Sequence, residues 1–391
     1  MMPNCEPSAG FRACCDVGPV FRRTYREPGL AESGIARRAE ILRTKVWNDI
    51  LNPMRAYAIE QFGDVKGLKM VDRAEPKISA RQVLVRMQAA SLNYRDLLVL
   101  RGQYDRNPQL GRIPLSDGAG EVISVGSEVT RFKPGDQVAG CFFQGWISGR
   151  FHSEFHRTAL GGSIDGVMAE LVAFSEGGLV PVPSYLSSIE AATLPCAALT
   201  AWQALVVRGG LAAGENVLLL GTGGVSIFGL QFAKASGAKV IITSSNDSKL
   251  QRARELGADE CINYQTNPAW GKEAARLSGT DGVDHVIEVG GAGTFSQSVR
   301  ACRFNGHIGL IGVLAGKETS TEIFSIVPKS LNVYGVYVGS REMFEAMNRA
   351  LAQNRIRPVV DKIFPFREAA EAFRYLESGS HFGKIVIEFD R

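Results

Sequence analysis

The stretch VLLLGTGGVSIFGLQFAKASGAKVIITSSN, residues 217–246, does most to limit what this chain can fold into. It contains an apolar strand, a turn rich in glycine, a helix and a second apolar strand. From about residue 189 onward, strands and helices of this length keep alternating along the sequence. Such alternation predicts an α/β domain in which helices cover both faces of a parallel, doubly wound sheet.

The sequence before this region has a different pattern. Between residues 54 and about 180, short segments that alternate or run apolar are separated by turns rich in glycine and proline, which predicts a β-rich domain with short helices. The tail returns to strand, helix and strand, and we expect it to rejoin that first domain. We therefore predict two domains. One combines residues 54–185 with residues 342–391, and the other spans residues 186–341.

Residues 1–53 differ from the rest because arginine, cysteine, glycine and proline recur there with little periodicity. We interpret them as an extension, expected to be poorly ordered, before a cytoplasmic enzyme. The alternative is a mitochondrial transit peptide, which the acidic residues Glu6, Asp16, Glu27, Glu32 and Glu40 disfavour. The net charge of +4 and the absence of a long apolar run give no reason to expect nucleic acid or a membrane as a partner. Scattered cysteines indicate a reducing compartment.

The glycine-rich turn predicts a dinucleotide site. Gly221 ends the strand at a position that needs permissive dihedral angles, and Gly223 lets a pyrophosphate approach the backbone at the start of the next helix. Thr222, Gly224 and Val225 complete this turn, and Ser226 stands where the dinucleotide fingerprint usually has its third glycine. The alternative is a glycine-rich turn in a flavodoxin-like sheet that binds another ligand or none.

The end of the second strand indicates which dinucleotide binds. An NAD site usually has an acidic residue there, but this strand ends at Ser244. A carboxylate would repel a 2′-phosphate, whereas serine can donate a hydrogen bond to it. Lys249 and Arg252 follow on the next helix and offer positive charge. Asp247 is either the N-cap of that helix or a ribose ligand, and the second possibility would favour NAD. We expect NADP(H).

Other predicted cofactor contacts come from the ends of later strands. Tyr264, after the third strand, is expected to line the adenosine pocket. Val289 and Gly290 end the fourth strand, and Gly312 and Val313 end the fifth. Because the carboxyl ends of parallel strands meet at one edge of a sheet, we expect these four residues to flank the ribose and the nicotinamide.

Several local strings, taken together, resemble the medium-chain dehydrogenase/reductase superfamily. They are NYRDLLVLRGQY, GAGEVISVGSEVTRFKPGDQV, AATLPCAALTAWQAL, GTGGVSIFGLQFAK and HFGKIVIEF. The resemblance covers residues 54–391 and implies a GroES-like catalytic domain, a Rossmann coenzyme domain and a cleft between them. It also implies that Lys384, in HFGK, lies near the cofactor phosphate. It further implies a homodimer formed through the edge strand at 331–339.

The resemblance also bears on metal binding. Alcohol dehydrogenases of this superfamily hold a catalytic zinc, but here the first ligand position falls on Asn93 and the second on Ser116, and only Cys196 resembles a ligand. One thiolate cannot hold a tetrahedral zinc. His152 and His156 have the spacing of a helical metal pair, but we expect a surface loop there. The chain therefore resembles the zinc-independent, quinone-oxidoreductase-like branch, and we predict no metal.

Tyr104 resembles the tyrosine that the enoyl-reductase branch of this superfamily uses, and Asn93 and Tyr94 are expected to line the same pocket. The alternative for Tyr104 is an aromatic ring packed on the cleft wall. We expect an NADPH-dependent oxidoreductase that transfers hydride to a quinone, an enone or another activated carbonyl compound. The alternatives are an NADP-dependent alcohol dehydrogenase or aldehyde reductase, and a nucleotide-binding scaffold with little catalysis.

Overall fold

Six parallel strands form the sheet that the alternating pattern predicts. The computed structural model describes residues 53–105, 107–312, 314 and 323–390. The strand order is β10-β9-β8-β11-β12-β13, and every neighbouring pair is parallel. The bounds are β8 (Asn216–Leu220), β9 (Lys239–Ser244), β10 (Glu260–Asn263), β11 (Val283–Glu288), β12 (Cys302–Leu310) and β13 (Asn332–Gly335). The order reverses between β8 and β11, where open α/β sheets bind their ligands.

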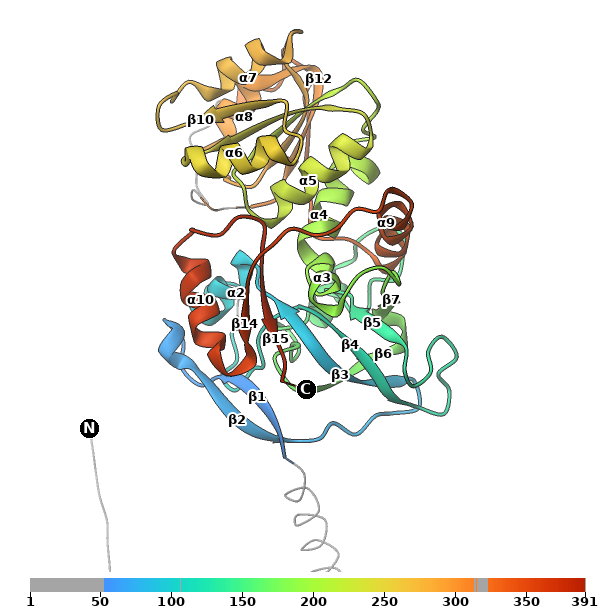
Figure 1. Cartoon of the computed structure of the whole chain (residues 1–391). Coiled ribbons are helices and arrows are strands. Elements are labelled where there is room, and N and C mark those ends of the chain that lie inside the picture. The colour runs from blue at the N-terminus through green and yellow to red at the C-terminus, as the bar shows by residue number, and fades with distance from the viewer. Residues whose placement is uncertain (1–52, 106, 313, 315–322, 391) are drawn as a thin grey trace, which may run out of the picture. The chain divides into compact units, whose positions relative to one another are not determined.

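Helices cover both faces of this sheet, which we call the Rossmann sheet (Figure 1). Val217 and Leu219 of β8 pack into one buried apolar cluster with α5 and α6, whereas Leu218 and Leu220 pack into another with α7 and α8. Side chains on a strand alternate between faces, so a continuous apolar run is what a strand covered on both sides requires. The helices are α5 (Gly224–Ala235), α6 (Asp247–Glu255), α7 (Trp270–Ser278) and α8 (Phe295–Ala301).

Most of the remaining described chain builds a β-rich lobe. Its main sheet has the order β14-β15-β3-β4-β5-β7, β6 pairs with β3, and β1 and β2 form a separate antiparallel pair. The strands are β1 (Pro53–Ile59), β2 (Leu68–Ala74), β3 (Gln82–Ser91), β4 (Asp117–Val125), β5 (Gln137–Gly140), β6 (Leu171–Ser175), β7 (Leu179–Pro181), β14 (Val360–Pro365) and β15 (Lys384–Glu388). The lobe also contains the helices α2 (Tyr94–Leu100) and α10 (Ala369–Glu377).

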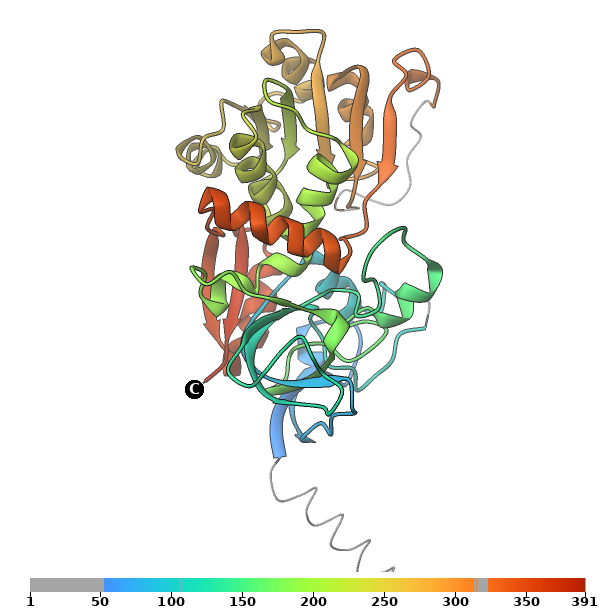
Figure 2. The same ribbon diagram turned by 90° about the vertical axis from the view of Figure 1, so that its right-hand side faces the viewer.

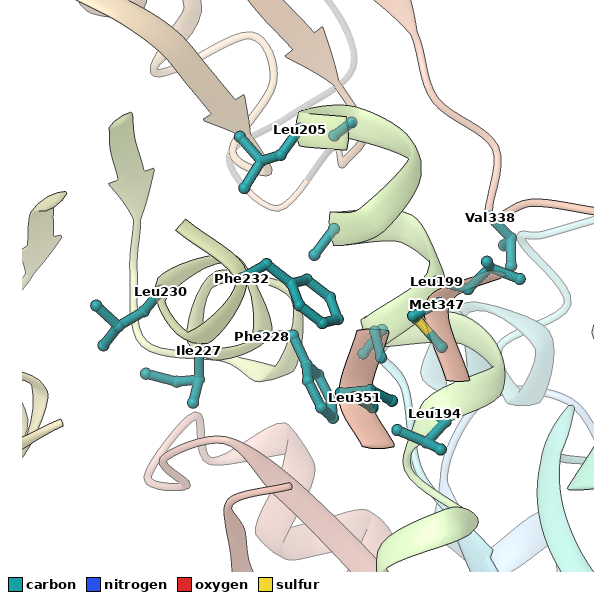
Figure 3. Close-up of a cluster of buried hydrophobic side chains, with 14 of the residues drawn as sticks. Leu194, Leu199, Leu205, Ile227, Phe228, Leu230, Phe232, Val338, Met347 and Leu351 are labelled. Atoms are coloured by element: carbon teal, nitrogen blue, oxygen red, sulfur yellow. The ribbon is translucent and has the colours of Figure 1, made fainter. Parts of the chain in front are cut away.

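A helical layer lies between the two sheets (Figure 2). It contains α3 (Ser188–Ala191), α4 (Leu199–Trp202) and α9 (Arg341–Asn354), and Asn348 of α9 donates a hydrogen bond to Pro181 of β7. Figure 3 shows how apolar side chains of α4, α5 and α9 meet in a single buried cluster. This packing joins the Rossmann sheet to the β-rich lobe, and the confirmed fold is a GroES-like β-rich part combined with a Rossmann part.

Two details differ from the sequence prediction. The strand expected over 331–339 ends at Gly335, and Val336 and Val338 are instead buried in the apolar cluster between the sheets. The segment TFSQSVRACRFNG, residues 294–306, has the pattern of one continuous helix in the sequence. The helix α8 nevertheless ends at Ala301, because β12 already begins at Cys302.

Some expectations are not tested by this structure. Residues 1–52 of the extension predicted over 1–53, or of the alternative transit peptide, lie outside the described residues, and Pro53 is the first residue of β1. The domain boundaries at 185/186 and 341/342 stay predictions. Among the described residues, no helix has both the length and the apolar character needed to cross a bilayer.

Candidate active site

A cleft of about 510 Å³ lies where the carboxyl ends of the Rossmann strands face the β-rich lobe. It brings together most of the side chains that the sequence singled out, from both parts of the fold. The predicted residues that line it are Asn93, Tyr94, Tyr104, Gly221, Thr222, Gly223, Gly224, Val225, Ser244, Lys249, Tyr264, Val289, Gly312 and Lys384.

The glycine-rich turn has the geometry of a dinucleotide cradle. Gly221 has φ +72°, a left-handed conformation that glycine adopts without strain. A Cβ atom built on Gly221 would meet no heavy atom of the described residues within 4 Å, and one on Gly223 would meet only His381, at 4.0 Å. Gly223 is the N-cap of the 12-residue helix α5 and has no side-chain cap, so the first N–H groups of α5 are left for a ligand. The turn therefore fits a pyrophosphate.

Ser226 replaces the third glycine without disturbing the turn. Its side chain is buried, and its Oγ donates a hydrogen bond to the Leu220 carbonyl oxygen at 2.7 Å. The hydroxyl is thus satisfied inside the turn, and the close contact between helix and strand is kept.

The end of β9 shows what stands in place of the usual acid. Ser244 is buried at the end of the strand, and its Oγ accepts a hydrogen bond from the Asn246 N–H at 3.3 Å. Asn246 is the N-cap of α6 and accepts from the Lys249 N–H, so the first of the two alternatives for Asp247, that it is the N-cap, is wrong. Asp247 is the first helical residue, and its carboxylate accepts from the side chain of Asn263.

The two cations predicted on α6 are placed differently. Lys249 lines the cleft, its Nζ donates to the Gly379 carbonyl oxygen at 2.6 Å, and burial lowers its pKa. Arg252 does not line the cleft, because its guanidinium pairs with Asp361 at 2.9 Å and stacks on Phe382.

Sequence reasoning missed a histidine beside Lys249. His381 lines the cleft, and burial, together with the nearby charges of Lys249 and Lys384, lowers its pKa to about 4. The imidazole is therefore neutral at pH 7, and its Nδ1 has no hydrogen-bond partner among the described residues. A neutral imidazole can still donate a hydrogen bond to a phosphate oxygen.

The ends of β11 and β12 place the remaining predicted cofactor residues. Val289 and Gly312 line the cleft, and a Cβ atom on Gly312 would lie 2.1 Å from the Val289 carbonyl oxygen, so only glycine fits there. Gly290 is not among the cleft-lining residues, and its N–H donates to the buried Glu288 carboxylate at 2.8 Å. Val313 lies outside the described residues.

A buried lysine stands at the junction of the two lobes. Lys384 is 3% exposed, and its Nζ donates to the Leu92 carbonyl oxygen and to Asn93 Oδ1, each at 2.6 Å. Burial lowers its pKa, while the charge of Asp117 opposes that change. Asp117 is fully buried, and its carboxylate accepts from the Cys196 N–H at 3.0 Å. These contacts form a polar network beside the cleft.

This network does not fit the zinc that related dehydrogenases hold. Ser116 Oγ donates a hydrogen bond to the Asp117 carboxylate, and the Lys384 ammonium donates one to Asn93 Oδ1. Burial raises the pKa of the Cys196 thiol, which disfavours the thiolate that would bind zinc. Zinc prefers thiolate, imidazole and carboxylate ligands, and a fixed ammonium repels it. No group of three or more histidine, cysteine or acidic residues among the described residues is arranged to hold a metal ion.

His152 and His156, whose spacing would suit a metal pair on a helix, make contacts of another kind. His152 is the N-cap of the short 3-10 helix Ser153–Thr158, and the ring of His156 packs 4.9 Å from that of Phe151 and 5.5 Å from that of Tyr337.

The catalytic candidate Tyr104 has a partner that the sequence did not reveal. Its hydroxyl oxygen lies 2.7 Å from that of Tyr337, which also lines the cleft. The guanidinium of Arg95 lies 4.5 Å from the centre of the Tyr104 ring, in the range of cation–π contacts. Tyr337 escaped notice because its segment looked like part of an edge strand.

The fold combines a Rossmann sheet with a GroES-like lobe, and its glycine-rich turn faces the cleft that both parts line. These features define the class of two-domain, dinucleotide-dependent oxidoreductases. Comparison with known protein families supports the same class. Residues 224–353 match the family described as zinc-binding dehydrogenase, and residues 79–184 match the alcohol dehydrogenase GroES-like domain.

Three similar proteins show how far the likeness extends. A zinc-type alcohol dehydrogenase-like protein of Schizosaccharomyces pombe is 43% identical over 80% of this chain and 92% of its own length. The 2-methylene-furan-3-one reductase of Solanum lycopersicum is 32% identical over 86% of this chain and 80% of its own. The crystal structure of a putative alcohol dehydrogenase from Sinorhizobium meliloti is 42% identical, with a TM-score of 0.80, over 86% of this chain and 99% of its own.

The chain therefore belongs to the medium-chain dehydrogenase/reductase superfamily, in its zinc-type alcohol dehydrogenase-like group. It is an oxidoreductase, and its family implies a nicotinamide nucleotide as the cofactor.

Proposed function

We propose that this chain is an NADPH-dependent, metal-independent reductase of quinones, enones or other activated carbonyl compounds. The observation that carries the cofactor choice is Ser244, which places a hydroxyl instead of a carboxylate at the end of β9, facing the cleft. Lys249 and His381 line the same cleft and add donors for a 2′-phosphate. A carboxylate near that phosphate would cost roughly 1 to 4 kcal/mol, depending on the local dielectric.

The residues that would hold the cofactor follow from the geometry. The turn Gly221–Val225 and the first N–H groups of α5 would bind the pyrophosphate, while Val289 and Gly312 would flank the ribose and nicotinamide. When bound, the reduced nicotinamide supplies a hydride to an electron-poor carbon of the substrate.

The protein's own contribution concerns the negative charge that develops on the substrate oxygen. The Tyr104 hydroxyl lines the cleft and can donate a hydrogen bond to that oxygen. Asn93 and Tyr94 line the cleft beside it and limit how a substrate can be oriented. An enone or quinone spreads this charge over a conjugated system, so hydrogen-bond donors can take the place of a Lewis acid. A proton from solvent then completes the reduction.

A second candidate is the interconversion of an alcohol and an aldehyde. It is favoured by the names of the Schizosaccharomyces and Sinorhizobium relatives. Without a metal, this reaction would depend on Tyr104 alone to polarise an unconjugated carbonyl group, which is a harder task than enone reduction.

Both candidates are tested by one set of measurements. We expect NADPH to bind at least about tenfold more tightly than NADH in a fluorescence titration, a difference of about 1.4 kcal/mol. We also expect methyl vinyl ketone or 1,4-benzoquinone to be reduced at the same rate before and after dialysis against a chelator. Stoichiometric zinc, with activity lost on chelation and ethanol as the preferred substrate, would support the second candidate instead.

We also propose that the chain forms a homodimer through β13. This strand is at the edge of the Rossmann sheet, and an exposed edge invites pairing with another strand. Phe324 and Val327, which closely precede β13 in the sequence, are more than half exposed. Sedimentation velocity should give about twice the monomer mass of 42.3 kDa. A species with the mass of one monomer at micromolar concentration would contradict this proposal.

A further inference from the structure

The paired hydroxyls of Tyr104 and Tyr337 form a link between the two lobes inside the cleft. Tyr104 follows α2 in the β-rich lobe, and Tyr337 follows β13 of the Rossmann sheet. Their oxygens are 2.7 Å apart, and either one can be the donor. A pair of hydroxyls has two hydrogens but uses only one between them. One hydrogen is therefore left to point at a ligand in the cleft.

Tyr337 is held rigidly by what surrounds it. Its ring packs on three phenylalanines, with ring centres 4.9 Å from Phe143, 5.6 Å from Phe151 and 6.1 Å from Phe142. Burial raises the pKa of its hydroxyl, so the group stays a neutral donor.

The backbone beside Tyr337 is strained. Val338 has φ +57°, a left-handed conformation that is unusual for a β-branched residue. Figure 3 shows the Val338 side chain beside Leu199 and Met347 in the buried cluster. A Cβ atom on Gly339 would lie 2.7 Å from Leu199 Cγ, so this segment is fitted closely against α4. Such strain persists only where the surrounding packing enforces it, so the backbone next to Tyr337 is held in place by its contacts with α4.

Tyr104 is held from the other side by Arg95. That guanidinium is 9% exposed, and one of its nitrogens donates to the Leu160 carbonyl oxygen at 2.9 Å. It lies 4.5 Å from the Tyr104 ring and 4.9 Å from the Phe142 ring. The guanidinium also pairs with the buried Asp96 carboxylate at 3.3 Å, which offsets part of its charge. Because the guanidinium lies against the ring of Tyr104, the remaining positive field still favours negative charge near the Tyr104 oxygen.

We propose that Tyr337 is a positioning residue, which donates its hydrogen to the Tyr104 oxygen and so directs the Tyr104 hydrogen at the substrate oxygen. A hydroxyl that accepts a hydrogen bond becomes a better donor, so the pair binds an oxyanion more strongly than Tyr104 alone. Arg95 adds a favourable field. This inference rests on the proposed carbonyl reduction and deepens it, because it names a second residue on which the reaction depends.

The test compares three variants that each lose one hydroxyl and keep the ring. Tyr337→Phe removes the proposed positioning group, and Tyr104→Phe removes the donor to substrate. Tyr334→Phe is the matched control, because Tyr334 also lies under an arginine, Arg208, and its hydroxyl donates to the Ala204 carbonyl oxygen outside the cleft. NADPH affinity is measured for each by fluorescence, and kcat and KM are measured with methyl vinyl ketone.

We expect Tyr337→Phe to lower kcat about tenfold, the value of one hydrogen bond, with NADPH affinity unchanged within about twofold. In the Tyr104→Phe background, adding Tyr337→Phe should lower kcat no further, because its effect passes through Tyr104. Tyr334→Phe should leave kcat within about twofold of the wild type. The proposal is overturned if Tyr337→Phe has a normal kcat, or if its loss is the same with and without Tyr104.

A measurement without turnover separates this inference from the proposed function. 4-Nitrophenolate carries its charge on an oxygen, and its absorbance shifts when that oxygen accepts hydrogen bonds. We expect the wild type in the presence of NADP⁺ to bind it about tenfold more tightly than Tyr337→Phe does. Failure to bind NADPH would overturn the proposed function, whereas equal binding of 4-nitrophenolate by both proteins would overturn the role of Tyr337.

Discussion

A Ser244→Asp variant is expected to bind NADPH about 100-fold more weakly than the wild type, while its affinity for NADH changes by less than about threefold. The new carboxylate would stand at the end of β9, inside the cleft and close to where a 2′-phosphate would bind. NADH has a hydroxyl at that position, and a carboxylate can accept a hydrogen bond from it. Both affinities can be measured by fluorescence titration at constant ionic strength.

The control for this prediction is Ser248→Asp. It adds the same charge four residues further on, at an exposed position of α6 that does not line the cleft. We expect it to weaken NADPH binding by less than about threefold, because surface charges are screened by salt. If both variants lose NADPH affinity equally, or if Ser244→Asp weakens NADH and NADPH to the same extent, the argument for NADP(H) from β9 is wrong.

A Lys384→Met variant is expected to lower the free energy of unfolding by about 3 kcal/mol. The substitution leaves the buried carboxylate of Asp117 without its neighbouring cation, and Asn93 Oδ1 loses its donor. Adding Asp117→Asn to Lys384→Met should restore about half of the loss, because the uncompensated charge is then gone. Urea unfolding near neutral pH measures all of these values.

The pH dependence gives a second check on the same network. Burial already raises the pKa of Asp117, and loss of Lys384 would raise it further. A carboxyl group with a raised pKa in the folded state destabilises that state as the pH rises through this pKa. The deficit of Lys384→Met should therefore be smaller near about pH 5 than near about pH 8.

A surface ion pair serves as the control for Lys384→Met. Lys234 pairs with Asp259 at 2.8 Å, but both side chains are more than a third exposed. Lys234→Met should cost less than about 1 kcal/mol, as exposed pairs usually do. A loss for Lys384→Met no larger than this would show that the Lys384 network contributes little to stability.

Local signals in the sequence were enough to predict the Rossmann sheet. The apolar run of β8 is buried along its whole length, and Gly221 adopts the left-handed turn that its position suggested. The acid missing at Ser244 is likewise visible in the sequence, because it depends only on where β9 ends. These features depend on residues close together in the chain.

Two features of the site that depend on distant residues could not be predicted from local patterns. Tyr337 looked like part of a strand because VYGVYVG is rich in β-branched and aromatic residues, yet the turn at Val338 follows from packing on α4. His381 reaches the glycine turn only because Gly383 forms a bridge to Gly223, 160 residues earlier in the chain. No local pattern reports such a contact.

The place of β15 in its sheet has a consequence for how the chain matures. The strand lies between β14 and β3, and the Ser91 hydroxyl donates to the Ile385 carbonyl oxygen across 294 residues. During translation, β3 leaves the ribosome long before β15 is synthesised. Until then, the edge of β3 that pairs with β15 stays unpaired, and the sheet of the β-rich lobe is incomplete. The strands of the Rossmann sheet, by contrast, are synthesised one after another. Chaperone demand should fall on the early-synthesised half of this enzyme, reversing the usual order in which amino-terminal domains fold first.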